Sequence, residues 1–244
     1  PFTGNPPLDA DHGQWLSMSV APDGSPAIAF RDNTSTGLGF AIGEVNRDGT
    51  LSWAYEQVDG YPDEAGVDQG DTGTHNALTF APDGTAWIAY HAPGQGVLRA
   101  AFRRNGVWTS ELVDSGSGLR PKTGLWTSIG IGLDGQPIIV YHDEGAGTLR
   151  MATRTGEGAW STDTVLEGEP FSGTDAEGNP IEREADVGEY TDLIVDGNTH
   201  YIACYDRGQQ RLLLLEGFAG AYATTVVDTE GNAGQWPSLV KDGD

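Results

Sequence analysis

The chain has 244 residues, of which 37% are hydrophobic and 9% aromatic, so it is long enough to bury a sizeable core. Its 36 acidic side chains outnumber 13 lysines and arginines, and the net charge of -23 disfavours nucleic acid or an anionic membrane as a partner. No apolar run approaches the roughly 20 residues of a membrane span, so we expect no membrane insertion. The acidity suits an extracellular or cell-surface protein, a high-salt setting or cation binding, and it is also explained by solubility alone.

The first repeated feature along the chain is a glycine followed, two positions later, by an aromatic residue or histidine. The 36 glycines and 13 prolines already predict many turns and few helices. The spacing between successive copies is 60, 51, 64 and 46 residues. The five copies are Gly13/Trp15, Gly73/His75, Gly124/Trp126, Gly188/Tyr190 and Gly234/Trp236.

Four strand-like segments follow in each repeat. A short apolar run ends in an Asp-Gly pair, which favours a tight hairpin because glycine tolerates a positive φ. The second run ("PAIAFRD", "AWIAYHA", "PIIVYHD", "HYIACYD") is apolar at nearly every position, which predicts burial of both faces. The third run alternates, as expected of a half-buried strand, and the fourth ("SWAYEQVD", "VWTSELVD", "AWSTDTVL", "AYATTVVD") follows a turn.

Four strands per unit of roughly fifty residues predict an all-β protein with the β-propeller fold and four-stranded antiparallel blades. A β-sandwich with hairpin repeats is the alternative. We expect four complete blades at residues 13–73, 74–123, 124–187 and 188–233, within a single propeller region spanning 1–244. Residues 1–12 match the end of a preceding blade and 234–244 the start of a next one. We therefore expect a larger ring of six to eight blades, completed by the same or another chain.

The repeat also resembles a known group. The pattern W-x-S-L, DG-x-P-x-I-x-Y-x-D, G-x-L-x-x-A, W and VD is similar to the repeats of sialidase-like propellers, related to Asp-box or BNR repeats, in secreted bacterial proteins. The Asp-box itself is degenerate here, since only a glycine and an aromatic survive, as in Gly106/Trp108 and Gly158/Trp160. The resemblance implies the fold and leaves the function open, because propellers carry many activities.

Propeller topology gathers one set of loops on one face, where binding is expected. The first-strand aromatics could stack on a sugar, but their recurrence in every unit favours packing between blades. The aspartates that end the second strands are expected to cap their own turns. A sialidase would need an arginine cluster, and Arg31 and Arg120 do not supply one. The candidate ligand-binding residues on this face are Trp15, Arg31, His75, His91, Trp126, His142, Tyr190 and Trp236.

Two acidic insertions, at residues 59–73 and 166–188, are candidate calcium loops on the same face. Asp175, Glu177 and Asn179 follow the opening spacing of an EF-hand loop, but Pro180 stands where that loop requires glycine. Irregularly spaced carboxylates suit weak calcium binding, and solvated acidic loops are the simpler interpretation. The candidate metal ligands are Asp63, Asp68, Asp71, Asp175, Glu177 and Asn179, and no other cofactor is expected.

The absence of common catalytic motifs favours a binding role. The chain has no CxxC, HExxH, P-loop or GxSxG sequence, and its single cysteine, Cys204, lies in an apolar run. We therefore expect a secreted, non-catalytic binding or scaffold module for a glycan, a peptide or a partner protein. The alternatives are a glycosidase-like enzyme and a structural subunit of an extracellular assembly. Two carboxyls about 5–10 Å apart in a pocket would favour the enzyme.

Overall fold

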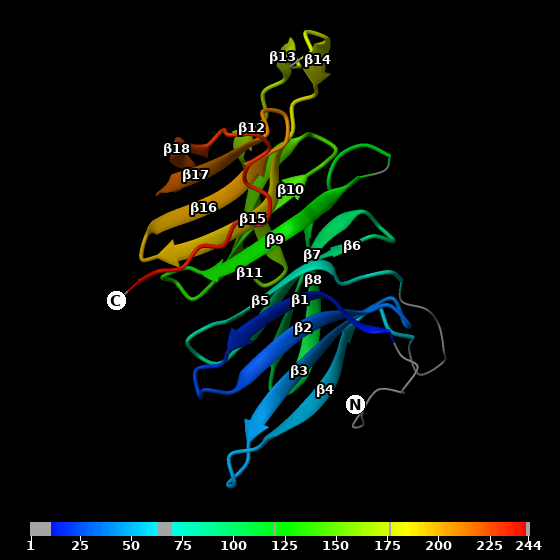
Figure 1. Ribbon diagram of the computed structural model, residues 1–244. Coiled ribbons are helices and arrows are strands. Elements are labelled where there is room, and N and C mark those ends of the chain that lie inside the picture. Colours follow the sequence, from blue (N-terminus) through cyan, green and yellow to red (C-terminus); the bar gives the residue numbers. More distant parts are fainter. Residues whose placement is uncertain (1–10, 63–69, 120, 176, 243–244) are drawn as a thin grey trace.

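The computed structural model describes residues 11–62, 70–119, 121–175 and 177–242, and every regular element in them is a strand (Figure 1). No helix in this part of the chain could span a membrane. The first two blades contain β1 (His12–Val20), β2 (Pro26–Asp32), β3 (Gly37–Val45), β4 (Leu51–Asp59), β5 (Thr74–Phe80), β6 (Ala86–Ala92), β7 (Val97–Arg104) and β8 (Val107–Asp114).

The third and fourth blades continue in chain order, separated by a small hairpin. The third has β9 (Thr123–Ile131), β10 (Pro137–Asp143), β11 (Thr148–Gly156) and β12 (Ala159–Glu167). The fourth has β15 (Val187–Asp196), β16 (Thr199–Asp206), β17 (Arg211–Phe218) and β18 (Ala221–Asp228). The hairpin is β13 (Phe171–Thr174) with β14 (Pro180–Arg183).

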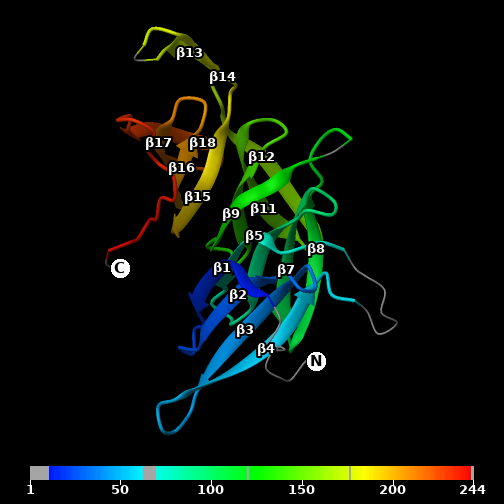
Figure 2. The same cartoon turned by 45° about the vertical axis from the view of Figure 1, so that its right-hand side comes forward.

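Each blade is an antiparallel sheet whose strands pair in sequence order, and the blades follow one another around an axis. The first strands β1, β5, β9 and β15 are consecutive neighbours on the inner side, as both views show (Figures 1 and 2). The prediction of an all-β propeller built from four-stranded antiparallel blades is confirmed. The strands pair in sequence order because short turns join each strand of a blade to the next.

The core is divided into three clusters, one at each junction between adjacent blades. Every residue of β6 and of β10 is buried, because each of these second strands lies in a sheet covered on both faces by other blades. This explains why the second segments are apolar at nearly every position. The fourth strands are the most exposed, in agreement with an outer edge.

Charged side chains also join the blades, and the best-buried group lies between the second and third. Glu111 of β8 accepts two hydrogen bonds from Arg154 of β11, over 2.8 and 3.0 Å. Its carboxylate accepts two more from the Gly158 backbone N–H at 2.9 Å and from Trp160 Nε1 at 3.0 Å. Gly158 and Trp160, at the turn into β12, therefore hold an interblade carboxylate. The same arrangement recurs one junction earlier with Glu56, Arg103 and Trp108.

A second interblade contact repeats at the C-terminal end of the fourth strands β4 and β8. The hydroxyl of Tyr90 donates to Asp59 Oδ2 of the preceding blade over 2.5 Å, and that of Tyr141 donates to Asp114 Oδ2 over 2.6 Å. Arg150 adds an ion pair to Asp114 at 2.5 Å. The repeated aspartate of the "VD" motif is thus a partner for the tyrosine of the next second strand.

The first blade has one face that no described residue covers. Met18 of β1 is 64% exposed, whereas its equivalents Leu78, Ile129 and Leu193 in the other blades are between 6% and 8% exposed. At the other flank, residues 232–241 run beside β15. Lys241 Nζ lies 3.0 Å from Asp196 Oδ1 there. No sheet closes between the first and fourth blades among the described residues.

The second insertion departs from the expected irregular loop, because its tip forms the hairpin β13–β14 (Figure 1). Asp175 Oδ1 accepts hydrogen bonds from the backbone N–H groups of Glu177 at 3.0 Å and Asn179 at 2.7 Å. The Asn179 side-chain amide donates to the other carboxylate oxygen over 2.9 Å. These local hydrogen bonds fix the turn that connects β13 to β14. The spacing of Asp175, Glu177 and Asn179, which is similar to the start of a calcium loop, belongs to this turn.

Candidate functional site

An unusual backbone conformation recurs at the third position of every repeat. Trp15, His75, Trp126, Tyr190 and Trp236 have φ between 50° and 59°, a left-handed region that is uncommon for bulky residues. In the four first strands these positions coincide with shifts of register against the second strand. Such positions cost of order 1–3 kcal/mol each unless the surroundings fix them. At each bulge the ring no longer follows the regular alternation of side chains between the two faces of its sheet.

The five released rings meet each other and form one group, which we call the aromatic cluster. Trp126 lies at its centre, with ring centroids 4.5 Å from His75 and 4.1 Å from Tyr190. Trp15 stacks on His75 at 3.8 Å, and Trp236 lies 4.4 Å from Tyr190. Four rings are half-buried, and Trp236 is 69% exposed. One aromatic surface is therefore assembled from four blades and the C-terminal segment.

Side-chain hydrogen bonds link the first strands just beside this surface. Asn76 donates to the Trp15 carbonyl, Thr127 to the His75 carbonyl, and Thr191 to the Trp126 carbonyl. These donors satisfy carbonyl groups that the bulges remove from strand pairing. An open cavity of about 220 Å³ lies among these residues and has no charged side chain in its lining, which consists of Trp15, His75, Asn76, Trp126, Thr127, Tyr190, Thr191, Trp236 and Pro237.

His75 acts within the cluster as a neutral ring. Burial, together with the nearby His91 and His142 imidazoles, lowers the pKa of His75 to about 3. It therefore carries no charge at neutral pH, and it packs between Trp15 and Trp126 as an aromatic side chain.

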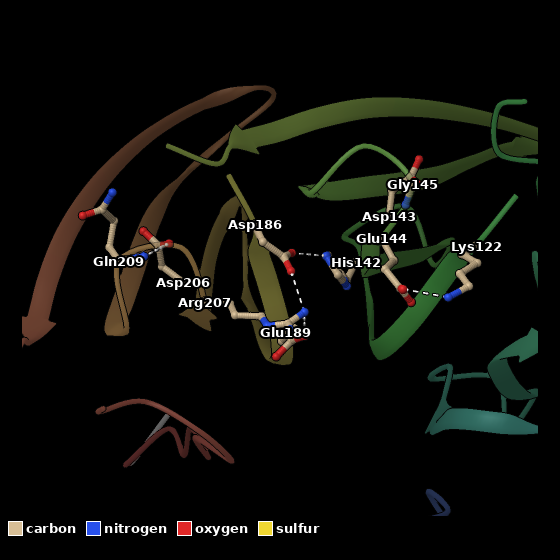
Figure 3. A network of polar contacts seen from close by, with 10 residues as sticks. All are labelled: Lys122, His142, Asp143, Glu144, Gly145, Asp186, Glu189, Asp206, Arg207 and Gln209. Carbon is tan, nitrogen blue, oxygen red and sulfur yellow. Dashed lines mark hydrogen bonds and ion pairs between the residues drawn. The ribbon is translucent and has the colours of Figure 1, made fainter. Parts of the chain in front are cut away.

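A network of charged groups lies on the loop side of the third and fourth blades (Figure 3). His142 Nε2, at the end of β10, is 2.7 Å from Asp186 Oδ1. Arg207, which follows β16, donates through Nη1 to Asp186 Oδ2 over 3.2 Å and lies 3.8 Å from Glu189 Oε1. Lys122 and Glu144 pair beside it at 2.7 Å. Two carboxylates thus share one guanidinium group.

The pKa values of these two carboxyls move in opposite directions. Burial, followed by the charge of Asp186, raises the pKa of Glu189. Burial acts in the same sense on Asp186, but its hydrogen bonds to His142 and Arg207 outweigh burial and lower its pKa. Asp186 Oδ2 and Glu189 Oε1 lie 3.2 and 3.8 Å from the same atom, Arg207 Nη1. These two carboxylate oxygens are therefore no more than 7.0 Å apart.

Glu189 directly precedes Tyr190, a member of the aromatic cluster, in the chain. Besides burial, the charge of Glu189 raises the pKa of both Tyr190 and Tyr205, whose rings lie 6.1 Å apart. The same position of the other repeats holds an uncharged residue: Gln14, Thr74, Leu125 and Gln235. The fourth blade therefore places a carboxylate where the repeat does not require one.

The structure brings together five of the eight expected ligand-binding residues, namely those of the aromatic cluster. His142 belongs to the adjacent charged network. Arg31 is directed elsewhere, since it donates to Asp71 at 2.6 Å and to Asn33 at 2.8 Å. His91 Nδ1 lies 2.8 Å from the Thr123 carbonyl. The turn-capping expectation is met, for example by Asp32, which accepts bonds from the backbone at Thr34 and Ser35.

Sequence reasoning missed Glu189 and Arg207, and it did not connect Asp186 with either of them. The signal that would have found Glu189 is the break in the repeat, because it alone is acidic at its position. Asp186 and Arg207 were not identifiable in this way, since their pairing depends on how two loops meet. Asp186 lies at the end of the second insertion, and Arg207 lies in the turn between β16 and β17.

The expected calcium ligands are distributed over separate contacts. Asp63 and Asp68 lie outside the described residues. Asp71 pairs with Arg31, and the Asp175 carboxylate is used by its own turn. Within the described parts of the chain, no group of three or more histidine, cysteine, aspartate or glutamate side chains could hold a metal ion. Calcium binding by the acidic insertions stays a prediction.

No protein-family model matches this sequence, and no curated protein matches it. Among solved structures, a protein of unknown function from Dyadobacter fermentans has a TM-score of 0.61 and 11% identity, with 88% of this chain and 65% of that chain covered. A Hadza microbial sialidase has a TM-score of 0.55 and 11% identity over 89% and 46%. The exo-β-1,3-galactanase of Phanerochaete chrysosporium with galactose has 0.53 and 9% over 87% and 49%.

This chain therefore spans between about half and two thirds of the length of these propeller proteins. At such low identity the likeness establishes the fold alone. Sialidase and glycosidase propellers are its structural neighbours, whereas no sequence comparison supports the finer resemblance to Asp-box repeats.

Proposed function

We propose that this protein is a carbohydrate-binding module of propeller fold that holds a sugar against the aromatic cluster. The single observation that carries the proposal is the gathering of five aromatic rings from separate repeats beside an open cavity. Small-molecule sites are concave, largely apolar and aromatic, with a few polar groups that fix orientation. Ring faces suit the apolar C–H face of a sugar, and the neighbouring charged network offers partners for its hydroxyl groups.

A glycosidase-like enzyme is the second candidate, and one observation favours it. Glu189 and Asp186 lie within a separation compatible with glycoside hydrolysis, and their pKa values are shifted in opposite directions. Binding is supported better, because both oxygens of Asp186 are already engaged by His142 and Arg207. The cavity lining also contains no carboxyl group. A secreted, extracellular setting is part of the same proposal, and the net charge of -23 supports it.

The test is a glycan array followed by titration of the best-bound glycan. Trp236→Ala removes the most exposed ring of the cluster, so we expect at least a 10-fold loss of affinity with an unchanged melting temperature. Trp53→Ala is the matched control, since it removes a partly exposed tryptophan from the outer strand β4. Binding of no glycan, or equal affinities of the wild type and Trp236→Ala, would contradict the proposal.

Turnover distinguishes the second candidate. Neutral galactosides are suitable first substrates, because a galactanase with bound galactose is among the structural neighbours. Under the binding proposal, prolonged incubation with β-1,3-galactotriose leaves it intact. Hydrolysis by the wild type that Glu189→Gln abolishes would instead establish the enzyme.

A further inference from the structure

We propose that the Glu189 carboxylate is the polar anchor of the sugar site, and that the site consequently accepts uncharged sugars and rejects acidic ones. This inference rests on the carbohydrate-binding function proposed above and names the ligand class of that site. It starts from the exception in the repeat, since only the fourth blade has an acid before its cluster aromatic.

Glu189 is available for a ligand. Its side chain is 16% exposed and lies 3.8 Å from Arg207, beyond hydrogen-bond distance. Asp186, by contrast, is held by His142 at 2.7 Å and by Arg207 at 3.2 Å. Of the two carboxylates in this network, Glu189 therefore retains the greater capacity to accept hydrogen bonds. A carboxylate can accept from two neighbouring hydroxyl groups of a sugar at once.

The charges around Glu189 define which sugars fit. Arg207 is shared by the Glu189 and Asp186 carboxylates, so two negative charges face one guanidinium group here. The adjacent Lys122–Glu144 pair, at 2.7 Å, adds no net charge. Arg31 is likewise paired, with Asp71 at 2.6 Å. A sialic or uronic acid would bring a further anion to this surface, where Arg207 is already shared by two carboxylates, and like charges so placed are repelled.

Glu189 directly adjoins the aromatic cluster along the chain. Glu189 and Tyr190 are consecutive, and Tyr190 contacts both Trp126 and Trp236 in the cluster. The register shift between Glu189 and Asp192 is the bulge that brings the ring out of the strand, and the carboxylate is part of the same irregular segment. Glu189 lies outside the lining of the cavity, one residue from Tyr190, so a sugar stacked on the exposed Trp236–Tyr190 edge would reach this acceptor by extending past the cavity.

The experiment uses a glycan array with matched pairs that differ only by a terminal sialic or uronic acid. We expect the wild type to bind uncharged members, with at least 10-fold lower affinity for their acidic partners. Glu189→Gln keeps the shape of the side chain but removes its charge, so it should weaken binding of the best neutral glycan by about 10-fold or more. Glu216→Gln is the matched control and should leave affinity unchanged, because Glu216 is an exposed side chain of β17 outside the charged network.

The outcomes separate this inference from the function on which it rests. Failure of the wild type to bind any glycan overturns the proposed function and this inference with it. Equal affinity for acidic and neutral partners overturns this inference alone. So does an affinity of Glu189→Gln equal to that of Glu216→Gln, provided that the melting temperature of Glu189→Gln shows a folded protein.

Discussion

Replacing Glu111 by glutamine should destabilise the fold far more than the same change at Glu56, although the two occupy equivalent interblade positions. Glutamine keeps the shape of the side chain, but its NH₂ group faces donors that the carboxylate had accepted. Glu111 and Arg154 are only 6% and 8% exposed, whereas Glu56 and Arg103 are 20% and 34% exposed. Glu111→Gln therefore leaves a buried guanidinium group without its counter-charge, and solvent screens the equivalent loss at Glu56.

The magnitude follows from this difference in burial. Removing one partner of a buried ion pair costs about 3–5 kcal/mol, while an exposed pair contributes about 1 kcal/mol or less. Each kcal/mol lowers the melting temperature of a chain of this size by about 2–4 °C, which gives about 6–20 °C for Glu111→Gln. For Glu56→Gln the expected loss is about 2–4 °C. Urea denaturation monitored by tryptophan fluorescence, with both variants alongside the wild type, measures the free energies of unfolding.

The pH dependence gives an independent check. Burial would raise the pKa of Glu111, but hydrogen bonds from Arg154, Gly158 and Trp160 outweigh it and hold that pKa below the usual 4.5. A lowered folded-state pKa stabilises the fold above the unfolded value, and this stabilisation is lost as the pH falls through the folded pKa. The gap between the wild type and Glu111→Gln should therefore narrow below about pH 4. Variants within 1 kcal/mol of each other at pH 7, or a gap constant with pH, would refute the reasoning.

Three further predictions concern the cluster, the insertions and the open flank. Trp126→Ala should lower the melting temperature by about 6–12 °C, because the half-buried ring contacts four other rings and truncating a large aromatic side chain costs about 3 kcal/mol. A variant that melts like the wild type but no longer binds glycan would instead assign Trp126 to recognition. Weak calcium binding by the acidic insertions should raise the melting midpoint in millimolar calcium by only about 2 °C over that in EDTA, because Asp175 already bonds its own turn, and identical midpoints would contradict calcium binding. We propose that another propeller blade, in the same or another polypeptide, covers the flank at Met18. The isolated chain should then self-associate, and Met18→Asp should reduce this in sedimentation experiments whereas Leu133→Asp, on an exposed turn, should not; a monodisperse wild type would contradict it.

The sequence indicated the propeller because its signals are local and repeated. The continuous apolar run "PIIVYHD" predicted a strand buried on both faces, and β10 is buried at every residue. The Asp-Gly turns predicted hairpins between first and second strands, and each blade has its strands paired in that order. The second insertion was expected to be a loop, but its tip forms the hairpin β13–β14, with Asp175 in the turn. Strands of only four residues show too little alternation of apolar and polar residues to be recognised from the sequence.

The sequence by itself determined the four-stranded repeat and the positions that recur in it, because turn chemistry and hydrophobic periodicity act over a few residues. Tertiary structure decided which of those recurring side chains meet. The Gly-x-aromatic motif marks Trp126, but the sequence did not predict the left-handed backbone that directs its ring to four others from different repeats. The sharing of Arg207 by Asp186 and Glu189 depends on the contact of the segment at the start of β15 with the turn between β16 and β17. Such contacts arise from the packing of elements far apart in the chain, and no local pattern of residues encodes the distance between them.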